Sequence, residues 1–120
     1  MEEKDDKTII KTWIQHEYSK EKSLFWAKKY LNRKCLYEPQ VGWRLILGIL
    51  KYDKSDKILP GLAAGPMEDL LSDHGKEIIE QVKEEARTND RFNYLLGGVW
   101  QNRMDQDIWE EIQRIRKVVW

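Results

Sequence analysis

Apolar residues recur at the spacing of an α-helix along almost the whole chain, and no useful length alternates with the period of two expected for a strand. The most apolar stretch runs from Val41 to Leu50 and is hydrophobic nearly all round. A helix of that kind lies at the centre of a fold, covered on several sides. Gly48 within it costs up to about 1 kcal/mol relative to alanine, so we expect a neighbouring element to approach closely there.

Helix-start signals divide the chain into six or seven segments. These signals are Asp5 or Asp6, Ser19 or Ser23, Glu38-Pro39, Gly65-Pro66, the region of Lys76, Asn89 or Asp90, and Asp105 or Asp107. Residues 43–50 and 93–100 form a short internal echo, as two packed αα-hairpins would produce. A chain of 120 residues can bury one core. We therefore predict a single all-α domain, residues 1–120, with six or seven helices packed as consecutive αα-hairpins in a HEAT-like way.

The stretch from Leu59 to Gly75 holds two of the three prolines and three of the seven glycines. Proline is favoured in the first turn of a helix, so Gly65-Pro66 predicts a helix start. Glu68 then falls in the first turn, where its carboxylate can accept from a free backbone N–H and face the positive end of the helix dipole. His74-Gly75 predicts the end of the same helix, with a glycine that tolerates positive φ. The expected result is a short helix between two longer halves of the chain.

Two features near the C-terminal end leave alternatives open. Gly97-Gly98 fits either the interior or the end of the sixth helix. Trp120 follows Val118 and Val119 and fits either a side chain that folds back or one that presents an apolar contact.

The composition excludes several classes of protein. Lys and Arg together number 21 and equal Asp plus Glu, so a formal net charge of zero gives no global attraction to nucleic acid or an anionic membrane. No apolar run approaches the roughly 20 residues that span a bilayer, and residues 1–7 lack the apolar core of a signal peptide. The lone Cys35 lies on an apolar stripe and is expected to pack as a small hydrophobe. We expect a cytoplasmic protein without a nucleic-acid or membrane partner.

Several motifs together resemble a known pattern. They are LFWA at 24–27, Pro39 with Trp43, LAAGPMEDLL at 62–71, His74-Gly75 and LGGVW at 96–100. The chain resembles, over roughly Trp13 to Trp109, a bacterial domain-of-unknown-function family with an LAAGPLEDLL…HG…LGGVW signature. Met67 stands where leucine is usual, a change that conserves volume, and Lys83 stands where an acidic residue is expected. The resemblance implies a small bacterial protein and carries no activity with it.

One cluster has the residue types of a metal or acid–base site. It comprises Glu68, Asp69, Asp73, His74 and Glu77. A functional interpretation would place His74 with one or both aspartates at a metal, or use them as a general acid and base. The spacing matches no HExxH-like motif and no second histidine is near, so capping and solvation explain the cluster better. We expect no metal, no cofactor and no catalytic residue.

Charge is unevenly distributed in spite of the zero total. Residues 20–44 hold seven basic and two acidic side chains, whereas residues 68–85 hold seven acidic and two basic ones. Such a bipolar surface can present an acidic face to a basic partner. The predicted partner-binding residues are Glu68, Asp69, Asp73, Glu77, Glu80 and Glu84.

Three classes of function fit these observations. The first is a protein-binding module that neutralises or regulates a protein partner, such as an immunity protein that inhibits a bacterial toxin, whose acidic face could cover a basic nuclease surface. The second is a small enzyme or metal-binding protein centred on the Glu68–Glu77 cluster. The third is a scaffold or an oligomerising subunit, and the sequence leaves the oligomeric state open.

Overall fold

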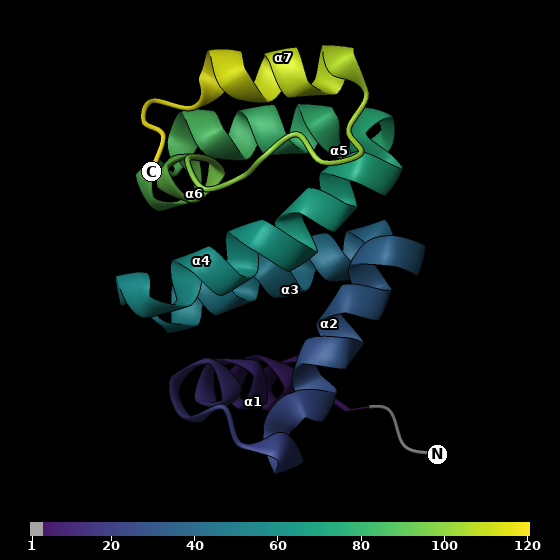
Figure 1. The fold of residues 1–120 in the computed structure, drawn as a ribbon. Helices are drawn as coiled ribbons and strands as arrows, with labels where there is room; N and C mark the ends of the chain where they lie inside the picture. Colours follow the sequence, from purple (N-terminus) through teal and green to yellow (C-terminus); the bar gives the residue numbers. More distant parts are fainter. Residues whose placement is uncertain (1–3) are drawn as a thin grey trace.

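The computed structural model describes residues 4–120, and this part of the chain is mainly helical, with no strand. Figure 1 shows the helices in stacked layers, with α1 at one end and α7 at the other. The α-helical segments are α1 (Asp6–Ser19), α2 (Phe25–Tyr37), α3 (Pro39–Tyr52), α4 (Leu59–Leu62), α5 (Glu68–Thr88), α6 (Asp90–Leu96) and α7 (Gln106–Ile115). Single turns of 3-10 helix span Lys22–Leu24 and Asp56–Ile58, and a π-helix spans Ala63–Met67. The all-α prediction is confirmed.

The helix α3 lies at the centre, as its composition predicts. It contacts α1, α2, α5 and α6, and its buried residues include Leu45, Ile46 and Ile49. A Cβ at Gly48 would lie 2.5 Å from Cδ1 of Ile10, so α1 is the close neighbour expected there. The buried apolar residues form one continuous core. Successive helices contact one another, α1 with α2, α2 with α3, and α5 with α6; the HEAT-like form of that packing stays a prediction.

Local capping signals place several helix starts correctly. The carboxylate of Asp5 accepts from the backbone N–H of Thr8 at 2.7 Å, and Asn89 accepts from that of Phe92 at 3.1 Å. Pro39 occupies the first turn of α3. The start of α2 is different, because neither Ser19 nor Ser23 caps it; a turn of 3-10 helix leads into α2 instead.

The predicted helix start at Gly65-Pro66 is wrong. Pro66 lies inside the π-helix, in a helical path that continues from Asp56 to Thr88. Proline in an α-helical interior removes one hydrogen bond and clashes with the preceding turn. The wider π turn, with its i→i+5 pattern, is an irregularity in which the ring is accommodated. The path begins instead at Ser55, whose hydroxyl accepts from the backbone N–H of Lys57 at 3.0 Å.

The predicted helix end at His74-Gly75 is also wrong, because α5 bends there and continues. His74 has φ −133° and ψ 24°, outside the helical region. Its Nε2 lies 2.6 Å from the carbonyl oxygen of Leu36, so the ring holds α5 to the end of α2. No glycine among residues 4–120 has a positive φ, so Gly75 serves close packing instead. A Cβ there would lie 2.9 Å from Cγ1 of Ile108 on α7.

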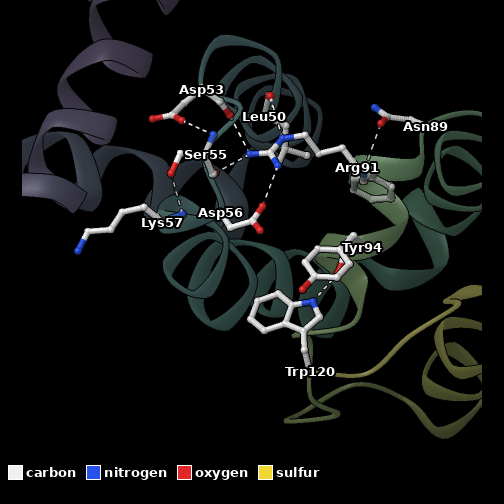
Figure 2. Close-up of polar contacts among 10 residues, drawn as sticks. Leu50, Asp53, Ser55, Asp56, Lys57, Asn89, Arg91, Tyr94 and Trp120 are labelled. Carbon is white, nitrogen blue, oxygen red and sulfur yellow. Dashed lines mark hydrogen bonds and ion pairs between the residues drawn. The ribbon is translucent and has the colours of Figure 1, made fainter.

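The connector between α3 and α4 is held by one arginine of α6. Figure 2 shows the guanidinium of Arg91 pointing into this connector. It donates to the carbonyl oxygens of Asp53 and Ser55, each at 2.8 Å, and to that of Leu50 at 3.4 Å. An ion pair with Asp56 at 3.5 Å completes the set. The polar connector is therefore an anchored segment of the fold.

The end of the chain folds back onto the end of α6. The backbone N–H of Trp120 donates to the carbonyl oxygen of Gly97 at 2.9 Å, and its indole N–H donates to that of Tyr94 at 2.6 Å. The two rings stack with centroids 5.7 Å apart, as Figure 2 shows. A Cβ at Gly98 would collide with the indole. Gly97 and Gly98 therefore follow the end of α6 and leave space for Trp120.

Candidate protein-interaction surface

The six predicted partner-binding residues all lie on the α5 segment, but they divide into two groups at the His74 bend. Glu68, Asp69 and Asp73 precede the bend and contact the loop that joins α6 to α7. The other three, Glu77, Glu80 and Glu84, follow the bend and lie on its exposed side.

Glu68 is a buried carboxylate with internal partners. It is 6% exposed, and its Oε2 accepts from the backbone N–H of Trp100 at 3.0 Å. Burial raises the pKa of this carboxyl, while hydrogen bonds from Trp100 and the side chain of Asn102 act in the opposite direction. The predicted capping role at a Pro66 helix start is wrong, because the N–H that Glu68 satisfies belongs to the distant loop.

Asp69 and Asp73 share one arginine of that same loop. Arg103 donates to Asp73 at 2.5 Å and to Asp69 at 3.3 Å. Burial raises the pKa of the Asp69 carboxyl, and the charge of Arg103 opposes that shift. The first three acids thus hold the loop against the first half of α5.

The role of Glu68 can be tested with two variants. Glu68→Gln keeps an acceptor for Trp100, so we expect its free energy of unfolding at pH 7 to lie within about 1 kcal/mol of the parent. Glu68→Ala leaves the N–H unpaired and should cost about 1–3 kcal/mol. Because the folded pKa is raised, the parent gains stability from protonation as the pH falls toward the ordinary value of 4.5. Glu68→Gln lacks that gain.

Urea melts at several pH values between 4 and 7 measure both effects. The free energy of unfolding of Glu68→Gln should therefore be closest to that of the parent at pH 7 and should fall further below it near pH 4. Equal losses for the alanine and glutamine variants would show that the contact to Trp100 contributes nothing.

The second group of acids is exposed to solvent. The side chains of Glu77, Glu80 and Glu84 are 55%, 84% and 64% exposed. Each carboxylate has a basic neighbour on the same helix: His74 Nδ1 at 3.9 Å from Glu77, Lys83 at 3.7 Å from Glu80 and Arg87 at 2.6 Å from Glu84. Exposed ion pairs of this kind contribute little to stability. Because the three glutamates are exposed, they remain accessible to another molecule.

Two hollows lie beside Glu80 and Glu84, and both hollows are lined by Glu80 and Lys83. The larger has a volume of about 490 Å³ and the smaller about 260 Å³. The larger is lined by Glu80, Lys83, Glu84, Ala86, Arg87, Asn93, Ile115 and Lys117. The smaller is lined by Lys76, Ile79, Glu80, Lys83, Asp107, Ile108 and Glu111. We call the two together the α5–α7 groove.

The sequence prediction omitted the acids that α7 contributes to this groove. Asp107 and Glu111 line the smaller hollow. Both lie on the polar side of a helix whose buried residues are Ile108 and Ile112. That helical spacing was the signal available in the sequence. The pKa of the Glu111 carboxyl is lowered, chiefly by the hydrogen bond from Arg114.

Comparison with known proteins gives a family and no activity. A family model described as a family of unknown function (DUF6869) matches residues 14–119. The chain belongs to this family. No curated protein and no solved structure matches it. The expected membership of an uncharacterised family is confirmed at this level, whereas the detailed signature and a bacterial origin stay predictions.

The second candidate site of this DUF6869 chain, the Glu68–Glu77 cluster, is engaged in packing. Asp69 and Asp73 bind Arg103, and His74 contacts a backbone carbonyl. Among residues 4–120, no group of three or more His, Cys, Asp or Glu side chains could hold a metal ion. Cys35 is fully buried, and burial raises the pKa of its thiol to about 12. It packs as a small apolar side chain, as predicted.

A helix that crosses a bilayer needs roughly 20 predominantly apolar residues. None of the helices within residues 4–120 combines the length and apolar character required to cross a bilayer.

Proposed function

We propose that this protein is a protein-binding module that neutralises or regulates a protein partner, as an immunity protein neutralises a toxin in the bacterial cytoplasm. The observation that carries the proposal is the α5–α7 groove with the exposed Glu77, Glu80 and Glu84 along α5. A surface of this kind needs no catalytic residue, because it acts by covering the partner.

The groove has the components of a protein interface. Apolar side chains form its floor, the partly buried Ile115 with the buried Ala86 in the larger hollow and the buried Ile79 and Ile108 in the smaller. Charged side chains surround them. An apolar centre with a polar, solvent-accessible rim is the usual anatomy of a specific interface.

A basic partner, such as a nuclease domain of a toxin, fits the three exposed glutamates. Carboxylates of this kind increase the rate at which an oppositely charged protein associates, and the attraction weakens as salt screens it. The enzyme alternative has less support, since Asp69, Asp73 and His74 are engaged in the contacts described above. A scaffold or oligomerising role remains the third alternative.

Capture of the partner from the native host, with the neighbouring open reading frames recorded, is the first test. The captured protein should have an activity that the purified module abolishes at a stoichiometric ratio. A partner whose activity is unchanged by saturating module would refute neutralisation.

The acidic side is tested with Glu77→Lys combined with Glu80→Lys. Both side chains point to solvent, so the fold should remain intact. We expect association with the captured partner to slow by at least about tenfold, with a smaller change in dissociation. The parent rate should fall between about 0.1 M and 1 M salt, where the screening length decreases from about 10 Å to about 3 Å.

The matched control is Glu21→Lys combined with Glu38→Lys. These two residues flank α2 outside the groove, and the change in net charge is the same. If the association rate changes neither in Glu77→Lys combined with Glu80→Lys nor with the salt concentration, the acidic side is not the docking surface.

A further inference from the structure

The outer side of α2 carries two cations between two aromatic rings. The helix buries Ala27, Leu31 and Cys35, which recur every fourth residue and face the core. The opposite line, also at steps of four, consists of Phe25, Lys29, Arg33 and Tyr37, all of them exposed. We call this line the α2 stripe. Each step advances about 6 Å along the helix axis, so the stripe is about 18 Å long.

The two rings at the ends of the α2 stripe are open to solvent. Phe25 is 44% exposed, and Tyr37 at 74% is the most exposed large apolar side chain in the described part of the protein. The ammonium of Lys29 lies 5.8 Å from the centre of the Phe25 ring. Phe25 also contacts the ring of His16, with centroids 5.5 Å apart, so its exposed part and the whole ring of Tyr37 are the surfaces available for stacking with a flat group.

Three basic side chains on the outer side of α2 lack acidic neighbours. Among residues 4–120, Lys28, Lys29 and Arg33 have no carboxylate within ion-pair distance. The sequence of α2 contains no Asp or Glu, and the nearest acids in the chain, Glu21 and Glu38, lie beyond its two ends. The basic residues of the α5–α7 groove differ, since Lys83 and Arg87 each pair with a glutamate. The α2 stripe therefore has unsatisfied positive charge.

We propose that the α2 stripe binds a single-stranded nucleic acid. Each nucleotide brings a phosphate and a flat base, and the stripe offers cations for the first and rings for the second. Stacking of bases on aromatic side chains beside Lys and Arg is the general mode of sequence-tolerant single-strand binding. An acidic protein segment would also match the cations, but it carries no flat group that recurs with each charge as a base recurs with each phosphate. This function is additional to partner neutralisation and uses a different helix.

The zero net charge does not oppose this assignment. Interactions between exposed charges decay over about 8–10 Å at physiological salt, so a ligand on α2 responds to nearby charge and not to the total. The expectation that nucleic acid is not a partner rested on the total alone. The distribution around α2 gives a different prediction.

The test measures fluorescence anisotropy of labelled oligothymidylate and oligouridylate of about 12 nucleotides, a length within the range that small single-strand sites cover. We expect the parent protein to bind, with an affinity that falls as salt rises. Lys29→Gln combined with Arg33→Gln should weaken binding at least about tenfold at low salt. It should also reduce the slope of log affinity against log salt by about 1.4, since each phosphate contact contributes about 0.7 for single strands.

The rings are tested separately. Phe25→Ala combined with Tyr37→Ala removes two stacking sites and should weaken binding at least about thirtyfold without changing the salt slope, since each stacked base contributes about 1–3 kcal/mol. Both side chains are exposed, and thermal melts verify that the variant folds. The control for Lys29→Gln combined with Arg33→Gln is Lys51→Gln combined with Lys54→Gln, two exposed lysines outside α2 with the same change in charge. It should retain the parent affinity.

Several results would overturn the proposal. They are an absence of binding by the parent, an equal loss in the control, and an unchanged affinity in the ring variant. Displacement of the oligonucleotide by polyglutamate as readily as by unlabelled oligonucleotide would also overturn it and would favour an acidic protein segment. Glu77→Lys combined with Glu80→Lys should not weaken oligonucleotide binding, so this proposal and partner neutralisation can fail independently.

Discussion

Phe92→Ala is expected to lower the free energy of unfolding by about 3–5 kcal/mol, the loss typical of a fully buried phenylalanine. Phe92 is 0% exposed and contacts the ring of Trp43 edge-on, with centroids 5.2 Å apart and an angle of 88°. It connects α6 to the central helix α3. The alanine variant loses the transfer energy of the ring and leaves a cavity that rigid neighbours fill only partly.

Urea denaturation of Phe92→Ala measures this loss, with Tyr52→Ala as the matched control. Tyr52 is an aromatic residue at the end of α3 and is 54% exposed, so its removal should cost less than about 1 kcal/mol. Similar losses for the two variants would mean that the α3–α6 contact contributes little to stability.

Gly42→Ala is expected to cost about 1–3 kcal/mol, a typical result of overpacking. A Cβ at this position would lie 2.9 Å from Cα, 3.0 Å from N and 2.8 Å from Sγ of Cys35. Two of these three atoms belong to the backbone of α2. The clash can therefore be relieved only by moving α2 away from α3.

Gly48→Ala on the same helix is the control for Gly42→Ala. Its Cβ would meet mainly the terminal Cδ1 of Ile10, which a rotation of that flexible side chain can relieve. Replacement of a helical glycine also gains up to about 1 kcal/mol of helix propensity. We expect the Gly48 variant to be near neutral in urea melts. Rescue of Gly42→Ala by Cys35→Ala would show that the sulfur atom, and not the backbone of α2, limits the approach.

Much of the fold could be predicted because its causes are local. The period of the apolar residues identifies helices, and the continuous apolar composition of Val41–Leu50 identifies the central one. Asp5 and Asn89 precede their helices in the sequence and cap them in the structure. A capping residue and the N–H that it satisfies are three residues apart, so both are visible in a short window of sequence.

The contacts of the first three acids could not be predicted in the same way. Glu68, Asp69 and Asp73 have partners in the loop at residues 100–103, some 30 positions further along the chain. Helical spacing reveals pairs three or four residues apart, as for Glu84 and Arg87. It gives no information about which distant loop will cover a carboxylate. The acidic side was therefore predicted as one surface, whereas the fold uses half of it internally.

The irregular helical path from α4 through α5 determines the direction around the helix axis in which the buried side chains point. From Leu59, residues of this path recur in the core every fourth position as Ala63, Met67, Leu71, Gly75 and Ile79. In a straight α-helix each step of four advances about 40° beyond a full turn, so five steps would rotate the last residue by about 200° relative to the first. The π-helix around Pro66 and the bend at His74 interrupt that drift. These two positions reset the rotation of the helix, which keeps one continuous line of side chains directed at the core.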